Sequence, residues 1–472
     1  MKVTFIDFFE DFYDKHPIYC LSACLKEHGI FVEYIFGRTI KTVIKKLHDI
    51  KPQVLLYSAF SAQTPQYIHF DKIVKNHFKI ISVIGGPGPT YDIEAIANST
   101  IDALCLGEGE YAIVDFIKSG FTYQKNMMHP KNELPREFYP FADLDRLPLP
   151  DRDILYSQDS LLRNMPSKQF LSGRGCPYHC TYCHNNAFNK LFRTCGNIIR
   201  KKSVDYLLEE IKDVKRKYLL KRLVFQDDTF IINKKWFFEF CERFPKEVGL
   251  PYTCNIRSNL IDEPTVEALK ESNCVVVNWS IESGNDFFRN EILKRQITKK
   301  NILNTGRLLN KYKISHRIGN IIGLPGEKFE EMLQTLQLNI EVRPNLALAN
   351  IFVPFKGLEL TNYALQKNYL PKEQMNNLPK TYFKKSIMNY TSQEKLKIEK
   401  LLYLFPIISK YPQLLFNPHI FNNLLKVPKQ LLRVIYDAVY GYNLMKLYCA
   451  NTGLATRLRI VKRFIISICR NH

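Results

Sequence analysis

Between residues 166 and 370 the chain repeats one pattern six times: a short apolar run of strand character, followed by an amphipathic stretch of helical period. This alternation predicts parallel strands joined by covering helices, and six units in series predict an open, partial (β/α)6 barrel. In such barrels the reacting groups sit at the C-terminal ends of the strands, so the polar residues after each strand matter most. The strands are predicted at 169–172, 223–226, 252–256, 275–281, 315–322 and 346–353, and the helices at 204–218, 236–244, 265–272, 299–312 and 329–341.

A second alternating region, residues 1–120, predicts a Rossmann-like doubly wound parallel sheet. Its strands are predicted at 3–6, 32–35, 54–58, 80–84 and 103–106, with a helix at 19–28. Five prolines between 121 and 165 predict a linker with little regular structure. The fold class is therefore α/β, and its predicted parts are the domain 1–120, the linker 121–165, the partial barrel 166–370 and a basic helical C-terminal region, 371–472.

The composition indicates the cellular compartment and the charge of the partners. Lysine and arginine number 67 against 46 acidic residues, a net charge of +21 that favours an anionic partner. The N-terminus lacks the pattern of a signal peptide, and no apolar run approaches the roughly 18 to 20 residues that cross a bilayer as a helix. The 12 cysteines have no regular spacing, which favours a reducing compartment over a disulfide framework. We therefore expect a cytoplasmic protein.

The most informative stretch follows the first barrel strand. Cys176, Cys180 and Cys183 form a C-x3-C-x2-C array, with Gly173 and Gly175 just before it. Three thiolates in one tight loop can bind three irons of a four-iron cluster and leave the fourth iron open to a chelating molecule. Glycines there would let the backbone approach the cluster. The alternatives are a zinc site completed by a neighbouring histidine, or three unconnected core cysteines; the candidate histidines are His179 and His184.

This array, with the aromatic Tyr182 before its last cysteine, resembles the signature of the radical S-adenosylmethionine (radical SAM) enzymes. The resemblance implies a [4Fe-4S] cluster whose open iron binds S-adenosylmethionine, and cleavage of that molecule to a 5'-deoxyadenosyl radical. It also implies that Tyr182 binds a cofactor, together with residues at the ends of later barrel strands, namely Asp228, Arg257, Glu282, Ser283 and Gly323. Asp227 and Glu327, taken singly, are as readily helix caps.

Residues 1–120 are similar to the cobalamin-binding domain of one subgroup of these enzymes. The similarity predicts cobalamin contacts at two glycine-rich strand ends, by Gly85, Gly86, Thr90, Gly107 and Glu108. The sequence departs from the pattern in two ways. Gly88 stands where a histidine is common in this subgroup. The Asp-x-His-x-x-Gly motif, by which other cobalamin proteins ligate cobalt, is only half present around His16. His16 is thus a cobalt ligand or an ordinary loop histidine. Cys20 and Cys24 hold a second cluster or are buried as small hydrophobes, and their i,i+4 spacing favours burial.

The C-terminal segment 457–470 interleaves cations with bulky apolar residues. This is the pattern of an interfacial helix, which predicts peripheral membrane contact, or of a helix that packs its apolar side on the barrel. No nucleic-acid recognition motif accompanies the charge.

These features predict a cobalamin-dependent radical SAM methyltransferase that acts on an unactivated carbon and takes electrons from an external donor. The first alternative is a radical cyclase, oxidase or rearrangement enzyme without methyl transfer. The second is a non-catalytic metal-binding protein. The substrate is a small molecule, lipid or peptide that one sequence does not identify.

Overall fold

The computed structural model describes residues 1–9, 13–135, 137–376, 378–379, 385–448 and 453. Their contacts divide the chain into two compact units. The first contains Met1–Asn164, Gly173–Pro177 and Ala187–Leu219. The second contains Met165–Ser172, Tyr178–Asn186 and the chain from Leu220 onward.

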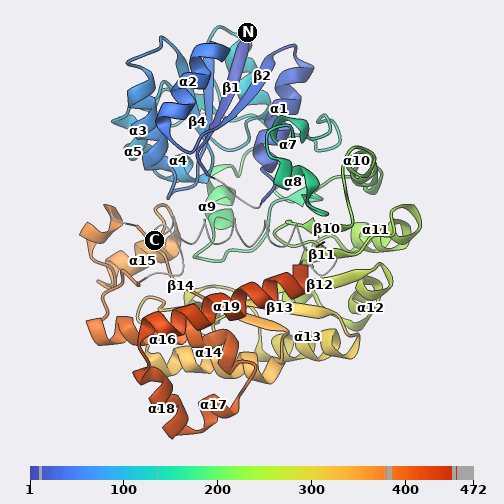
Figure 1. The fold of residues 1–472 in the computed structure, drawn as a ribbon, viewed down its shortest axis with the longest axis vertical. Helices are drawn as coiled ribbons and strands as arrows, with labels where there is room; N and C mark the ends of the chain where they lie inside the picture. Colours follow the sequence, from blue (N-terminus) through green and yellow to red (C-terminus); the bar gives the residue numbers. More distant parts are fainter. Residues whose placement is uncertain (10–12, 136, 377, 380–384, 449–452, 454–472) are drawn as a thin grey trace. The chain divides into compact units, whose positions relative to one another are not determined.

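The first unit is built on a six-stranded sheet of order β2-β1-β3-β4-β5-β6 (Figure 1). Its first five strands are parallel and confirm the five predicted ones, while the two-residue β6 adds an antiparallel edge. The direction of winding reverses between β1 and β3, and ligands of such sheets bind beyond the carboxyl ends of the strands at that point. The strands are β1 (Lys2–Asp7), β2 (Phe31–Phe36), β3 (Val54–Ser58), β4 (Ile81–Gly85), β5 (Ala103–Cys105) and β6 (Met127–Met128).

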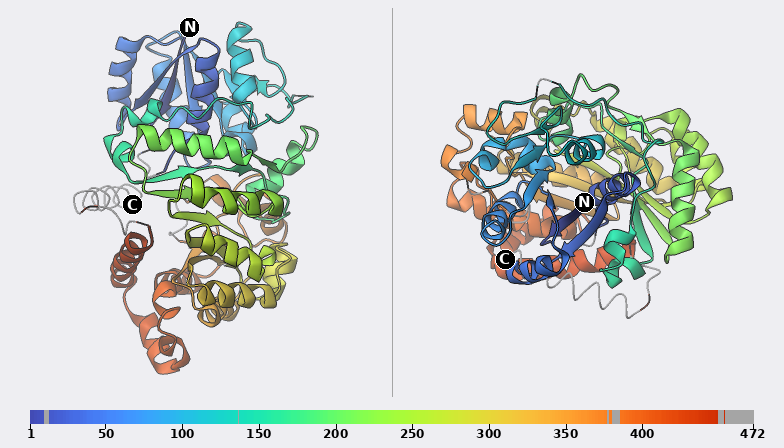
Figure 2. Two further views of the ribbon diagram at one scale, coloured as in Figure 1. Left: turned by 90° about the vertical axis from the view of Figure 1, so that its right-hand side faces the viewer. Right: turned by 90° about the horizontal axis from the view of Figure 1, so that it is seen from above.

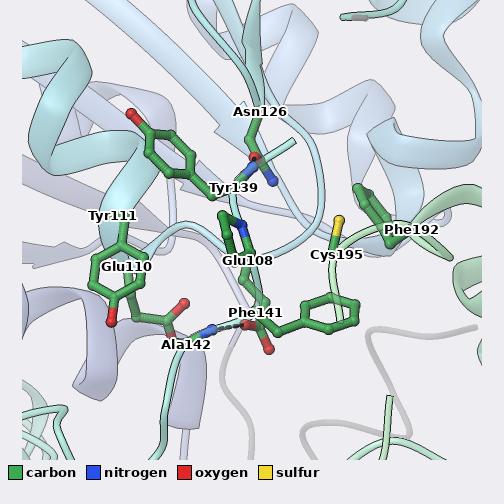
Figure 3. A pocket seen from close by; sticks show the side chains of 10 residues that line it. Glu108, Glu110, Tyr111, Asn126, Tyr139, Phe141, Ala142, Phe192 and Cys195 are labelled. Atoms are coloured by element: carbon green, nitrogen blue, oxygen red, sulfur yellow. Dashed lines mark hydrogen bonds between the residues drawn. The ribbon is translucent and has the colours of Figure 1, made fainter. Parts of the chain in front are cut away.

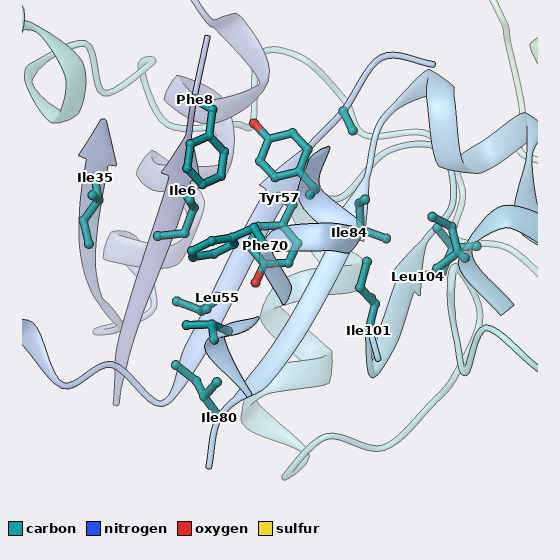
Figure 4. Close-up of a cluster of buried hydrophobic side chains, with 14 of the residues drawn as sticks. Ile6, Phe8, Ile35, Leu55, Tyr57, Phe70, Ile80, Ile84, Ile101 and Leu104 are labelled. Atoms are coloured by element: carbon teal, nitrogen blue, oxygen red, sulfur yellow. The ribbon is translucent and has the colours of Figure 1, made fainter. Parts of the chain in front are cut away.

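Helices cover both faces of this sheet, which confirms the doubly wound prediction. On one face α2 (Ile40–Ile50), α3 (Thr64–Val74) and α5 (Ile93–Ala97) bury their apolar sides against Ile6, Leu55, Ile84 and their neighbours (Figure 4). On the other face α1 (His16–Glu27) and α6 (Glu110–Lys118) pack together. The alternation of side chains along each strand makes both faces apolar, so helices are needed on both.

The sequence predicts little regular structure in the linker, but short elements occur there and just after it. They are α7 (Asp153–Tyr156), α8 (Ser160–Asn164), and an antiparallel ribbon of β8 (Gly173–Arg174) and β9 (Arg200–Lys201). Single turns and two-residue pairings have no periodicity, so a sequence pattern cannot reveal them. The first unit also contains α4 (Pro87–Tyr91) and α10 (Val204–Lys217), and α9 (His184–Leu191) spans the boundary between the units in the chain.

The second unit holds a six-stranded sheet of order β14-β13-β12-β11-β10-β7, in which every neighbouring pair is parallel. The sheet follows the chain order and ends in two edge strands, as the predicted partial barrel requires. Its strands are β7 (Ser167–Phe170), β10 (Arg222–Phe225), β11 (Tyr252–Asn255), β12 (Cys274–Glu282), β13 (Ser315–Ile322) and β14 (Leu346–Ile351). The helices between them are α11 (Lys234–Glu247), α12 (Glu263–Glu271), α13 (Lys299–Lys311) and α14 (Phe329–Val342), within three residues of their predicted ends.

The C-terminal region is helical, as predicted. It contains α16 (Ser392–Ile408), α17 (Gln413–Phe416), α18 (Pro418–Lys426) and α19 (Lys429–Tyr448), and α15 (Glu359–Gln366) precedes it at the end of the predicted barrel region. Helix α16 packs on β14, and α19 packs on α16 (Figures 1 and 2). None of the described helices combines the length and hydropathy that crossing a membrane requires. The basic segment 457–470 lies outside the described residues.

Candidate functional site

The three cysteines of the predicted cluster lie in the loop between β8 and α9. The Cys183 amide donates to the Cys180 carbonyl at 3.1 Å, and Asn189 Nδ2 donates to the Cys176 carbonyl at 2.8 Å. None of the three forms a disulfide, and neither do the other seven cysteines that the structure describes. One backbone hydrogen bond and one side-chain hydrogen bond therefore hold the backbone of the loop.

The glycines of this loop are required for packing within the protein. A Cβ on Gly175, whose φ is +91°, would lie 2.0 Å from the Ile198 carbonyl oxygen. A Cβ on Gly173 would lie 2.4 Å from the Arg200 carbonyl oxygen. Both glycines thus allow close packing on the β9 segment, and their approach to a cluster stays a prediction.

Arg174, two residues before Cys176, is held by carboxylates of the first unit. Its Nη1 donates to Glu108 Oε1 at 2.9 Å, and its Nη2 donates to Glu110 Oε1 at 2.6 Å. Arg200 on β9 also binds Glu108, at 2.5 and 3.0 Å. We call Glu108, Glu110, Arg174 and Arg200 the arginine clamp. Burial alone would raise the pKa of Glu108, but Arg174 and Arg200 lower it on balance, so the carboxylate stays ionised.

A small pocket lies beside the arginine clamp (Figure 3). Its lining includes Glu108, Glu110, Asn126, Tyr139 and Phe141. The Asn126 side chain donates to the Leu106 carbonyl and accepts from the Tyr139 amide, each at 2.7 Å. Because protein groups bind these polar atoms, the pocket belongs to the packing around the clamp.

In the second unit, Arg257 lies beside the cluster loop at the end of β11. Its Nη1 is 3.7 Å from Cys180 Sγ, and its guanidinium stacks 3.6 Å from the centre of the Tyr178 ring. Its Nη2 donates to the Arg295 carbonyl, and its Nε is buried without a hydrogen-bond partner among the described residues. A cation beside the sulfur compensates the negative charge that a thiolate ligand carries.

Tyr182, Glu282 and Arg295 form a second group in this unit. The Tyr182 hydroxyl donates to Glu282 Oε1 at 3.0 Å, and Arg295 Nη1 donates to both, at 2.5 and 3.2 Å. Arg295 Nη2 also donates to the Ser280 carbonyl at 2.8 Å. Burial raises the pKa of Tyr182 well above its ordinary value, so the phenol remains protonated.

The backbone at Glu282 is unusual. Its φ is +66°, and the pairing of β12 with β13 shifts register between Ser280 and Glu282. A bulge at the end of a strand redirects a side chain, and a left-handed non-glycine residue persists only where its surroundings hold it. Arg295 and Tyr182 provide that support for Glu282.

The other predicted residues of this unit are placed differently. Asp227 is buried and accepts from the Ser172 amide and hydroxyl at 3.0 and 2.5 Å, whereas Asp228 is exposed. The Ser283 hydroxyl accepts from the Asn285 amide at 3.3 Å. Gly323 ends β13 with a φ of +72°. Asp227 and Ser283 thus have structural partners, while cofactor contacts by Asp228, Ser283 and Gly323 stay predictions.

Glu327 lies four residues after Gly323 in the chain, and it is 1% exposed. One carboxyl oxygen accepts from the Leu324 amide at 3.0 Å, and the other is buried with no hydrogen-bond partner among the described residues. Burial raises the pKa of Glu327 to about 8, so the group is largely protonated at neutral pH.

In the first unit, the glycines predicted to contact cobalamin pack against the protein itself. A Cβ on Gly86 would lie 2.6 Å from the Ala59 carbonyl oxygen, and one on Gly88 would lie 2.5 Å from the Phe60 carbonyl carbon. The loops after β3 and β4 therefore approach each other closely, and no side chain fits at position 88 without moving them. Gly85 ends β4, and the Thr90 hydroxyl donates to the Gly86 carbonyl at 2.7 Å. Their contact with cobalamin stays a prediction.

The glycine-rich stretch after β5 also packs against other parts of the protein. A Cβ on Gly107 would lie 2.7 Å from the Phe192 ring. The Glu108 oxygens accept hydrogen bonds from Arg174, Arg200 and the Ala142 amide. A role for Gly107 and Glu108 in binding cobalamin stays a prediction, because the structure gives both residues other partners.

His16 and Cys24 of α1 are buried, and Cys20 is half-buried. His16 is the first residue of α1 and 7% exposed, and burial lowers its pKa to about 4, so the imidazole is neutral. Its Nε2 has no hydrogen-bond partner among the described residues, so ligation of cobalt stays a prediction. Burial raises the pKa of Cys24 to about 12 and also raises that of Cys20, which fits small hydrophobes better than thiolate ligands.

The donors present fit the groups that the sequence predicts. Three cysteines in one loop, none of them in a disulfide, match a cluster that leaves one iron open. No three His, Cys, Asp or Glu side chains in the described part of the chain are close enough to hold a single metal ion. A four-iron cluster bonds each cysteine to a different iron, so its ligands stand further apart than those of one ion. Glu282 and the free Nε of Arg257 suit an ammonium and a carboxylate, respectively.

Two family profiles match the chain. Residues 170–338 match the Radical SAM superfamily, and residues 11–117 match the B12 binding domain. An uncharacterised methyltransferase of Pyrococcus horikoshii is 27% identical over 75% of this chain and 78% of its own length. An anaerobic magnesium-protoporphyrin IX monomethyl ester cyclase of Rubrivivax gelatinosus is 24% identical over 72% of this chain and 64% of its own.

Among solved structures, the apo form of the cobalamin-dependent S-adenosylmethionine radical enzyme OxsB aligns with a TM-score of 0.67. Its sequence is 16% identical, and the alignment covers 100% of this chain and 75% of that one. This likeness confirms the fold of both units.

Sequence reasoning missed Arg174, Arg200 and Arg295. Each is one cation among 67 Lys and Arg, so nothing in the sequence distinguishes it. Only the fold brings these guanidiniums to the carboxylates of Glu108, Glu110 and Glu282.

Breaking the arginine clamp should loosen the cluster loop. We expect Arg174→Ala to destabilise the first unit by about 3 kcal/mol, because it leaves the largely buried Glu110 without its ion-pair partner. Arg174→Lys should retain part of this stability. The measurements are the thermal unfolding midpoint and the iron bound per chain after anaerobic reconstitution. Arg193→Ala removes an exposed arginine from the same unit and serves as the control, so equal losses in both variants would contradict the role of the clamp.

The buried carboxyl of Glu327 should make stability depend on pH. Its folded-state pKa of about 8 lies above the unpaired value of 4.5, so ionisation is penalised only in the folded protein. We expect the wild type to lose stability relative to Glu327→Gln as pH rises from 4.5 towards 8, with no further divergence above that. Unfolding midpoints of both proteins across this range test it, and parallel curves would refute it.

Proposed function

Because the chain belongs to the radical SAM superfamily and carries a B12-binding domain, we propose that it is a cobalamin-dependent methyltransferase acting on an unactivated carbon. The observation that supports this most is the combination of a three-cysteine loop with a doubly wound sheet of the B12-binding family in one chain. The similarity to the uncharacterised methyltransferase of Pyrococcus horikoshii, over 75% of the chain, agrees with it.

Bound together, the cluster, S-adenosylmethionine and methylcobalamin supply a radical that removes hydrogen and a methyl group that replaces it. The protein's own contribution is ligation and placement. Cys176, Cys180 and Cys183 are the cluster ligands, and Arg257 compensates charge at Cys180. Glu282, fixed by Arg295, presents a carboxylate that suits the ammonium or the ribose hydroxyls of S-adenosylmethionine.

The surroundings of Tyr182 limit the access of water. Tyr182 packs against an apolar cluster that contains Leu293, Leu324, Phe352 and Leu360, all of them buried. This apolar packing excludes water from part of the Tyr182 ring, and exclusion of water protects a radical from side reactions.

A radical cyclase is the second candidate. The relative from Rubrivivax gelatinosus is named as a cyclase and matches nearly as much of this chain as the methyltransferase does. Both reactions need the same cluster and the same S-adenosylmethionine contacts, so the two candidates differ in the product. A non-catalytic metal-binding role would leave the Tyr182–Glu282–Arg295 group without a task.

We further propose that the enzyme works in the cytoplasm with an external electron donor. None of the ten cysteines that the structure describes forms a disulfide, which agrees with a reducing compartment. Its substrate is a small molecule, lipid or peptide, and substrate recognition is expected in the loops at the strand ends.

The deciding experiment is anaerobic purification with analysis of bound cofactors and of products. We expect bound cobalamin, 5'-deoxyadenosine on addition of S-adenosylmethionine and a reductant, and a product heavier by one methylene unit. Cobalamin-free protein that still converts a substrate would favour the cyclase. A protein that holds iron and never forms 5'-deoxyadenosine would refute both.

Replacing Cys176, Cys180 and Cys183 with alanine should abolish the brown colour and the cleavage of S-adenosylmethionine together, because the cluster loses every protein ligand. Cys20→Ala/Cys24→Ala is the matched control in the same chain and should change neither. Iron content and 5'-deoxyadenosine yield are the measurements. Wild-type iron in the triple variant would remove the basis of the proposal.

A further inference from the structure

Helix α19 is apolar on two opposite sides. One side, with Leu432, Tyr436 and Leu447, is buried in the core of the second unit. The other side faces solvent, where Leu431 is 53% exposed, Val434 66% and Tyr442 61%. An apolar helix side is normally buried against a partner. The exposed fractions show that no described residue covers the outer side of α19.

The exposed apolar residues of α19 form one continuous stripe. Leu431, Val434, Ile435, Ala438 and Tyr442 follow the i, i+3, i+4, i+7, i+11 spacing that places residues on a single helix face. We call these five residues the α19 stripe. The preceding segment adds three exposed apolar residues, Tyr411, Phe416 and Ile420. Residues 411–442 thereby hold seven of the 19 large exposed apolar side chains of the described structure, which marks an interaction surface.

Cations outnumber acidic groups around the α19 stripe, although Lys429 and Arg433 of this helix pair with Glu399 and Asp437. Lys426 and Lys446 are exposed at the two ends of this region of the chain. The sequence from Asn417 to His472 contains nine Lys or Arg and a single acidic residue, Asp437, and five of these cations lie in 454–472, outside the described residues. Apolar residues that insert among acyl chains, together with cations that meet headgroup phosphates, are the two requirements for binding at an anionic lipid surface.

We propose that the α19 stripe docks the enzyme on an anionic lipid bilayer. A second copy of the chain fits less well, because two surfaces of a protein with a net charge of +21 would repel one another. A membrane supplies the opposite charge and covers the apolar side of α19 without a shaped protein partner. This inference concerns location and is independent of the radical chemistry.

Flotation of the full-length protein with vesicles tests this proposal. The vesicles contain either a mixture of phosphatidylglycerol and phosphatidylcholine, or phosphatidylcholine alone. We expect binding to the anionic vesicles only, weakened at high salt. Leu431→Gln/Val434→Gln should weaken that binding by about tenfold or more, since it removes two inserting side chains. Glutamine keeps helix propensity and both positions are exposed, so the fold should persist.

The control is Leu219→Gln/Phe238→Gln, which removes two exposed apolar side chains elsewhere and should bind like the wild type. Equal binding by the α19 variant and the wild type would overturn the proposal, as would a wild type that does not float with anionic vesicles. Light scattering after gel filtration tests whether a second copy of the chain covers the α19 stripe instead. A wild-type dimer that the α19 variant converts to a monomer would assign the stripe to a second copy instead.

Discussion

The ion pairs of the arginine clamp fix the first half of the cluster loop. Arg174 is covalently two residues from Cys176, and Glu108 and Glu110 hold its guanidinium at the end of β5. Removing charges from water is unfavourable, and these four residues offset that cost because each carboxylate meets at least one guanidinium. Gly173 and Gly175 allow the backbone to follow, because any side chain there would collide with the β9 segment. The position of the first cysteine thus depends on carboxylates that lie far from it in the sequence.

The second half of the loop is fixed by a different set of contacts. Arg295 holds Tyr182 and Glu282 together, while Arg257 lies over Tyr178 and beside Cys180. The backbone bulge before Glu282 turns its carboxylate to this group. Both halves of the loop are therefore held by arginines. Guanidinium suits this task because its planar fork can bind several acceptors at once.

The glycine-rich motifs of the first unit have a role in packing that their sequence does not suggest. Gly86 and Gly88 let the loops after β3 and β4 approach each other, and Gly107 makes room for Phe192. These contacts shape the carboxyl edge of the sheet, which is where ligands of doubly wound folds bind. A motif typical of cofactor binding can thus contribute indirectly, by building the edge that the cofactor meets.

The sequence alone determined the two parallel sheets, their helices and the cluster loop, because apolar periodicity and the spacing of Cys176, Cys180 and Cys183 are local properties. It could not reveal the β8–β9 ribbon or the short helices α7 and α8, which are too short to carry a period. Nor could it select Arg174 and Arg295 from the other cations, or show that Glu108 binds arginines. Those assignments belong to the tertiary structure, because an ion pair depends on distance in space, and folding alone brings residues separated by 64 positions within 2.6 Å.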